Sequence, residues 1–158
     1  MLIFGHKTVA MFDLWSIEHF INGIWCGYAA EKIIRKIFGS QELDHKTRMV
    51  VSFLIVLAAI MLWECAEHYV EAGVLPGMIG ARVTHWFQGV EHWSNRLIGD
   101  TITIFLGWIV YHKKNYLGVP AKIFSYVWLG VHIFIFPDSM YLHRVLLGCE
   151  IYFPLKGF

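Results

Sequence analysis

The chain has 158 residues, of which 57% are hydrophobic, 16% are aromatic and only 16% are charged. A soluble domain carries about 25% charged residues, so this chain has too few of them to cover a globule of its size in water. Together with a mean hydropathy of +0.53, this composition predicts a membrane protein with one domain. The net charge of +1 gives no reason to expect nucleic acid as a partner.

Four apolar segments are each close to the roughly 20 residues that a helix needs to cross a bilayer. In chain order they are residues 9–30, 49–71, 95–112 and 119–136. Segments 81–94 and 138–153 mix aromatic and charged residues, which favours helices that lie in the membrane interface. The predicted fold is all-α, an integral membrane four-helix bundle with one or two interfacial helices, in one domain over residues 1–158.

Lysine and arginine are divided unevenly between the loops of this topology. Eight belong to the loops after the first and third segments, and five lie on the other side. Because basic loops stay in the cytoplasm, both termini are expected on the outer side. In this orientation the acidic side chains of the four segments, together with His19, His68 and His132, fall in the outer half of the membrane.

Carboxyl, imidazole and amide side chains at this level are the candidate site residues. On the second segment one helix face carries four polar residues at i, i+3, i+4 and i+7, namely Glu64, Glu67, His68 and Glu71. The full candidate set is Glu18, His19, Glu64, Glu67, His68, Glu91, His92, Asn95 and Asp100. Charged groups near the bilayer centre are costly, which makes this set a predicted functional site.

So many carboxyl groups cannot all be ionised in a dry site. Protonation, pairing with Arg82 or Arg96, or one or two bound divalent cations would each resolve the repulsion. Mixed carboxylate and imidazole ligands suit iron, manganese, zinc or copper. The first hypothesis is therefore a transition-metal site, with Asn95 and Asp100 as outer or further ligands, that acts on a lipid or other apolar substrate from the outer leaflet.

Two other functions are compatible with the sequence. Histidines on different helices, such as His19, His68 and His132, can hold haem b in an electron-transfer subunit, and a quinone site is a related option. Alternatively, a small chain with many aromatic side chains can be an accessory or structural subunit of a larger membrane complex, or a homo-oligomer in the lipid bilayer. No serine-nucleophile elbow, phosphate-binding glycine loop or HExxH motif is present in the sequence.

Three motifs carry a family resemblance. They are Asp13-x5-His19-x2-Asn22-Gly23, Trp63-Glu64-x2-Glu67-His68 and Asn95-x4-Asp100-x6-Gly107. Over about residues 10–110 the chain resembles a family of small inner-membrane proteins of alphaproteobacteria that is known only as a domain of unknown function. The resemblance implies a multi-pass protein of the bacterial inner membrane with an embedded polar site, and it implies no reaction. In that family the positions of Asn22 and His68 carry His and Asn, so its ligand set does not carry over there.

Overall fold

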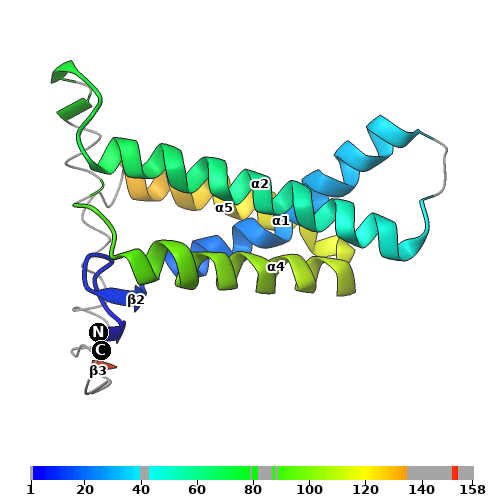
Figure 1. Cartoon of the computed structure of the whole chain (residues 1–158), viewed down its shortest axis with the longest axis horizontal. Helices are drawn as coiled ribbons and strands as arrows, with labels where there is room; N and C mark the ends of the chain where they lie inside the picture. The colour runs from blue at the N-terminus through cyan, green and yellow to red at the C-terminus, as the bar shows by residue number, and fades with distance from the viewer. Residues whose placement is uncertain are drawn as a thin grey trace.

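The computed structural model describes residues 2–39, 43–78, 80–81, 87, 89–134 and 151–152, of which 132–134 and 151–152 are described as backbone only. This part of the chain is mostly helical, which confirms the predicted all-α class. Its four long helices lie side by side and alternate in direction (Figure 1). They are α1 (Trp15–Phe38), α2 (His45–Glu71), α4 (Thr101–Lys113) and α5 (Gly118–Phe134). The π-helix η1 (Asn95–Asp100) leads into α4, and the short 3₁₀ helix η2 (Asn115–Leu117) leads into α5.

Helix α1 is the central helix, because it contacts α2, α4 and α5. Its packing on α4 depends on glycines that let the two backbones approach closely. A Cβ atom at Gly23 would lie 2.0 Å from the carbonyl oxygen of Ile104, and one at Gly107 would lie 2.0 Å from that of Phe20. Gly23 and Gly27 are spaced as in the GxxxG pattern by which membrane helices pack.

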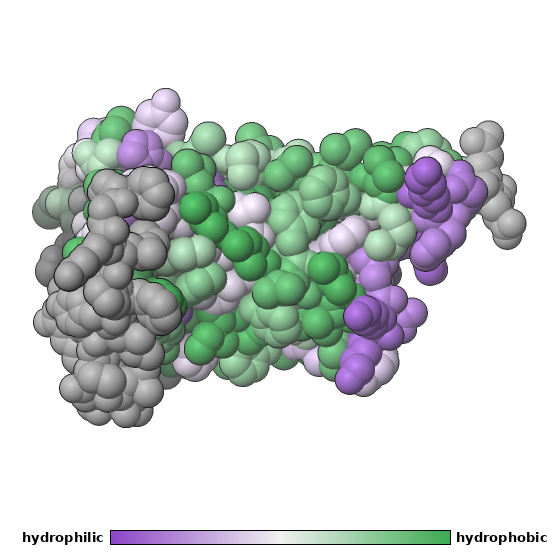
Figure 2. Space-filling view, turned by 60° about the horizontal axis from the view of Figure 1, so that its bottom comes forward, coloured by the Kyte–Doolittle hydropathy of each residue, from purple (hydrophilic) through white to green (hydrophobic). Residues whose placement is uncertain are grey.

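The outer faces of the helices are apolar along much of their length. Helix α2, for example, exposes Leu54, Leu62 and Trp63. Figure 2 shows a broad apolar band across the middle of the molecule and a hydrophilic end beside it. Of the helices that the structure describes, α2 alone is long and apolar enough to cross a membrane by length and hydropathy, whereas the sequence predicted four spans.

The first helix begins at Trp15 and not at residue 9, so that part of the prediction is wrong. Residues Ala10–Phe12 form strand β2 instead. Asp13 and Ser16 then start the helix, because Asp13 Oδ1 accepts from the backbone N–H of Ser16 and Ser16 Oγ accepts from that of Asp13, both at 3.0 Å. This reciprocal arrangement is a capping box.

The other helix bounds differ by less. Helix α1 continues past residue 30 to Phe38, because the basic segment after it opens with good helix formers. Helix α2 begins four residues before the predicted position 49, since Asp44 Oδ1 accepts from the backbone N–H of Thr47 at 3.1 Å. The third predicted helix, 95–112, is η1 with α4, and α5 covers the fourth to residue 134; residues 135–136 lie outside the described chain.

The structure supports the predicted interfacial helix at 81–94 only in part, because residues 81, 87, 93 and 94 are helical and residues 89–92 between them are not. Residues 89–92 are not helical, because Gly89 has φ 105°, a conformation that interrupts a helix. At the other segment, Ile151–Tyr152 form strand β3, which pairs antiparallel with β1 (Leu2–Phe4). Strand β1 also pairs in parallel with β2, so the sheet order is β2-β1-β3. The rest of the predicted helix at 138–153, and residues 82–86 and 88, lie outside the described chain.

Candidate functional site

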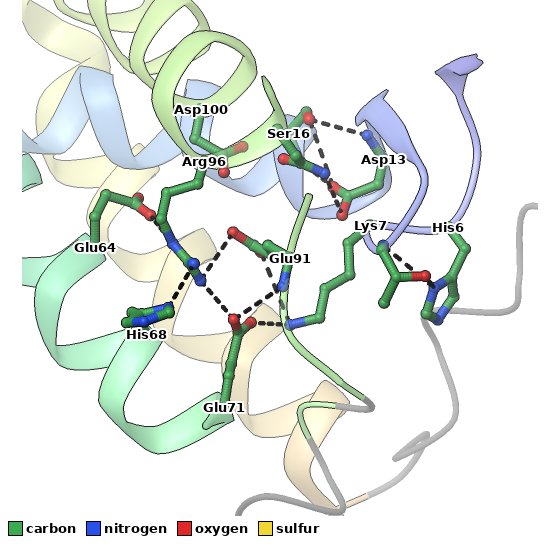
Figure 3. Close-up of polar contacts among 12 residues, drawn as sticks. His6, Lys7, Asp13, Ser16, Glu64, His68, Glu71, Glu91, Arg96 and Asp100 are labelled. Carbon is green, nitrogen blue, oxygen red and sulfur yellow. Dashed lines mark hydrogen bonds and ion pairs between the residues drawn. The ribbon is translucent and has the colours of Figure 1, made fainter. Parts of the chain in front are cut away.

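Buried polar side chains from three helices and the N-terminal segment gather at one end of the bundle (Figure 3). Helix α2 contributes Glu64, Glu67 and Glu71, which share one helix face and are all buried. The π-helix η1, a form often found at functional sites, buries Asn95 and Asp100. These buried polar groups come from separate helices and lie at one end of the bundle.

His19, Glu64 and Asp100 form the first cluster, which we call the His19 site. Each offers one nitrogen or oxygen atom, and these three atoms lie within 4.8 Å of one another. His19 Nε2 is 3.6 Å from Asp100 Oδ1. All four carboxyl oxygens of Glu64 and Asp100 are buried without a hydrogen-bond partner among the described residues. A buried polar atom without a partner costs about 1–3 kcal/mol, and more if it is charged, so this arrangement favours a cation at the site.

Glu67, Glu71 and Glu91 form a second cluster, again with one oxygen from each within 4.8 Å of the others. Two cations already pair with it. Lys7 Nζ contacts Glu71 Oε1 and lies 3.8 Å from Glu91 Oε1. Arg96 Nη2 donates to Glu71 Oε2 at 2.5 Å and lies 3.5 Å from Glu91 Oε2. Glu71 thus bridges Lys7 and Arg96 (Figure 3). We call the three glutamates of this cluster, together with Lys7 and Arg96, the ion-pair network.

Arg96 also connects the two clusters. Its Nε atom lies 3.4 Å from Glu64 Oε2 without forming a hydrogen bond to it. Pairing with Arg96 was one of the solutions that the sequence offered for the carboxyl repulsion, and it is present; Arg82 lies outside the described residues. The Arg96 charge is shared by three carboxylates, Glu71, Glu91 and Glu64, so it compensates Glu64 only in part.

The N-terminal segment supplies the buried lysine. Lys7 lies between β1 and β2 and is 1% exposed. Its carbonyl oxygen accepts from the backbone N–H of His92 at 2.9 Å, and its ammonium lies 5.0 Å from the centre of the Phe87 ring, within cation–π range. The segment therefore closes the polar end of the bundle and holds a cation inside it.

Asp13 ties this segment to η1. Asn95 Nδ2 donates to Asp13 Oδ2 at 3.2 Å, and Asn95 Oδ1 has no partner among the described residues. Burial raises the pKa of Asp13, although its hydrogen bonds from Ser16 and Asn95 oppose this shift. Asp13 is therefore a buried structural carboxyl group and not a side chain in water at the membrane surface.

Carboxyl groups outnumber cations at this end of the bundle. Among the described residues seven carboxyl side chains are buried here, whereas Lys7 and Arg96 are the cations that pair with them. Burial, followed by repulsion from Glu67, raises the pKa of Glu91 to about 9. Bound protons or a bound metal ion must balance the remaining negative charge.

A cavity of about 540 Å³ lies against the two clusters, with walls from α1, α2 and α5. Most of its lining is apolar, but Glu18, His19, Asn22 and Glu67 contribute polar groups. Glu18 is buried, and its Oε2 atom has no hydrogen-bond partner among the described residues. His19 and Glu67 each belong to a cluster and to the cavity wall, so the cavity reaches both.

The structure brings together most of the predicted site residues at this end. Those that are buried there are Glu18, His19, Glu64, Glu67, Glu91, Asn95 and Asp100. His68 is not among them: its side chain is exposed, and its Nδ1 lies 3.0 Å from Arg96 Nη1, where it can only accept. His92 is half-buried and hydrogen-bonded through Nδ1 to Ser94 Oγ at 2.7 Å. Neither histidine belongs to one of the two clusters.

The predicted site residues leave out two members of the ion-pair network, Glu71 and Lys7, although the spacing already places Glu71 on the polar face of the second segment. Glu71 continues the stripe of Glu64 and Glu67 by one helical turn, and this spacing was a sufficient signal to include it. Lys7 offered no such signal, since it lies in a short turn far along the chain from Glu71 and Glu91. Its role depends on long-range packing.

No family model, curated protein or solved structure matches this chain. The resemblance to a family of small inner-membrane proteins therefore stays a prediction.

Proposed function

We propose that this protein is a multi-pass inner-membrane protein that binds one divalent transition-metal ion at the His19 site. The proposal rests on the missing hydrogen bonds of the Glu64 and Asp100 carboxyl groups within the described part of the chain. Their four carboxyl oxygens are buried and lack hydrogen bonds among the described residues, and a ring nitrogen of His19 lies within ligand-sharing distance. A divalent ion would accept a ligand atom from each of these three residues at once.

Protonation alone is a poorer solution for this cluster. A proton on Glu64 or Asp100 would give that group one donor, and it would leave the other oxygens without a partner. A metal ion would instead be held by two carboxylates and an imidazole, a combination that suits iron, manganese, zinc or copper. Such an ion, when bound, supplies Lewis acidity toward a polar group in the adjoining cavity.

A single metal ion at the His19 site is better supported than one metal ion in each cluster. The second cluster, Glu67, Glu71 and Glu91, already has Lys7 and Arg96 within ion-pair distance. A divalent ion there would be repelled by both cations at short range. We therefore assign the metal to the His19 site and a positioning role to the ion-pair network.

A membrane location is supported by the surface of the bundle. Apolar side chains are exposed on α1, α2, α4 and α5, and a soluble monomer rarely exposes apolar patches of this extent. The glycine-mediated contact between α1 and α4 is typical of helices in lipid. In the proposed topology all four helices span the membrane, the basic loops face the cytoplasm, and both termini and the site lie toward the periplasm.

The alternative functions have less support. Haem b between His19 and His68 would need both to face one space, yet His19 lines the cavity and His68 is exposed beside Arg96. The side chain of His132 lies outside the described residues. An accessory subunit without a metal is the strongest competitor, because a polar cluster can also serve assembly, and the next experiment separates the two.

The test is elemental analysis of protein purified in mild detergent from cells grown with added iron, manganese and zinc. We expect about one metal ion per chain in the wild type, and less than about a tenth of that in His19→Gln and Asp100→Asn, because each removes a ligand. Matched controls are His112→Gln, in the last turn of α4, and Glu31→Gln, in the C-terminal half of α1; they remove an imidazole and a carboxylate away from the site. The controls should keep the metal. A folded wild type without metal, or equal metal in all variants, would contradict the proposal.

A further inference from the structure

The cavity has the shape of a groove along one helix. Its lining residues on α1 recur every three or four positions from Trp15 to Ile33, which is one face of the helix over about 27 Å, at about 1.5 Å per residue. A volume of about 540 Å³ spread over that length gives a mean cross-section of about 20 Å². The space is therefore long and narrow, and it fits one extended hydrocarbon chain better than a compact ring system.

The groove is apolar along its length and polar at one end. Its middle and far parts are lined by side chains such as Ala29, Ile33, Ala59 and Ile60. At the end nearer the start of α1 lie Glu18, His19 and Glu67. A ligand with one apolar tail and one small polar head would match both parts at once.

The polar end selects the charge of that head. The described residues that line the cavity include two carboxyl groups, Glu18 and Glu67, and no lysine or arginine. Even with a divalent ion at the His19 site, the buried carboxyl groups at this end outnumber the positive charges. An anionic head would add negative charge to an end that already needs bound protons or a metal ion to balance its carboxyl groups. A hydroxyl or amino head can donate to Glu18 Oε2, which is buried without a partner among the described residues.

We propose that the groove binds a lipid with a single hydrocarbon chain and a hydroxyl or amino head, placed with its head beside Glu18 and the His19 site. This inference rests on the proposed function, because it makes the lipid the ligand that meets the metal. The lipid enters sideways from the apolar surroundings of the bundle, since the N-terminal segment with Lys7 closes the polar end.

The probes are octadecanol, octadecylamine and octadecanoic acid, each with a pair of bromine atoms on the chain to quench tryptophan fluorescence. Trp15, Trp25 and Trp63 line the groove and report occupancy. In delipidated protein we expect saturable quenching by the alcohol or the amine at concentrations at least about tenfold below those for the acid. Comparison of the alcohol with the amine identifies the head.

Two neighbouring alanines on α2 provide a matched pair of variants. Ala59 lines the groove, and Ala58 does not. Ala59→Phe should weaken binding at least about tenfold, because each methylene kept out of the groove counts about fourfold, whereas Ala58→Phe should leave it unchanged. Glu18→Gln should reduce the preference over the acid, and Glu31→Gln should not.

Equal effects of the two phenylalanine variants, or binding of the acid as tight as that of the alcohol and amine, would overturn the inference. Metal content is measured in the same samples. Loaded wild type that binds none of the three probes contradicts the groove assignment alone. Protein that binds the alcohol or amine but holds no metal contradicts the proposed function and leaves the groove assignment standing.

Discussion

Replacing Lys7 with Met removes the ammonium group that the N-terminal segment holds inside the bundle. The side chains of Lys7 and Glu71 are both almost fully buried, and their charged atoms are in contact. Methionine has a similar length and no charge, so the variant tests the charge and not the volume. The structure predicts that Lys7→Met is strongly destabilising at neutral and alkaline pH.

The expected loss in the free energy of unfolding depends on the interactions that Glu71 keeps when Lys7 is replaced. Breaking a buried ion pair costs about 3–5 kcal/mol, because it leaves a charge without a partner. Here Glu71 keeps its hydrogen bond from Arg96 at 2.5 Å, so we expect the lower end, about 3 kcal/mol. That corresponds to a change of more than a hundredfold in the ratio of folded to unfolded protein. At about pH 5 the cost should be smaller, because the carboxyl groups can take up a proton instead.

The assay is reversible unfolding in mixed micelles with increasing dodecyl sulfate, followed by circular dichroism at about pH 5 and about pH 8. Carboxyl groups whose pKa is raised by burial take up protons toward the lower of these two pH values. Lys46→Met is the control, since Lys46 is exposed at the start of α2. Equal stability of the two variants at the higher pH would refute the assignment of Lys7 to a buried network. A cost that grows as the pH falls would refute the electrostatic cause.

Three further predictions concern packing, titration and topology. Gly23→Ala should destabilise the protein by about 1–3 kcal/mol, because its Cβ would meet the Ile104 carbonyl. Gly130→Ala should be neutral or stabilising in the same unfolding assay, because a Cβ atom there has no atom of the described residues within 4 Å. Because the folded pKa of Glu91 is raised from 4.5 to about 9, the folded state holds an extra proton between these values. The free energy of unfolding in metal-free protein should therefore fall as pH rises through this range, and Glu91→Gln should flatten that slope. A reporter enzyme that is active only in the periplasm should be active when fused to the N-terminus and inactive when inserted after residue 113; the reverse pattern would contradict the proposed orientation.

Local sequence patterns were sufficient to predict the helices and the level at which their polar residues meet. The carboxyl stripe on α2 repeats at helical spacing, and the apolar segments are long, so neither depends on knowing what packs against them. The helix start at Trp15 was also readable, because Asp13 and Ser16 have the spacing of a capping box. The apolar residues that precede them concealed this signal.

Long-range contacts were not readable from the sequence. Strands β1 and β3 join residues at opposite ends of the chain, and strands of two or three residues carry no period that a local pattern can detect. Long-range packing also decides which of two neighbouring residues lies in the site and which lies on the surface. Glu67 and His68 are both compatible with the polar face of α2, and packing against the neighbouring helices decides that Glu67 is buried and His68 exposed.

The proposed metal ion is held by three side chains, His19, Glu64 and Asp100. Anomalous X-ray diffraction at the absorption edge of the metal found by elemental analysis tests this assignment most directly. We expect one anomalous peak at about 2.0–2.2 Å from a ring nitrogen of His19 and from an oxygen of each carboxylate. A peak among Glu67, Glu71 and Glu91, or crystals of folded protein grown with the metal that show no peak at His19, would contradict it.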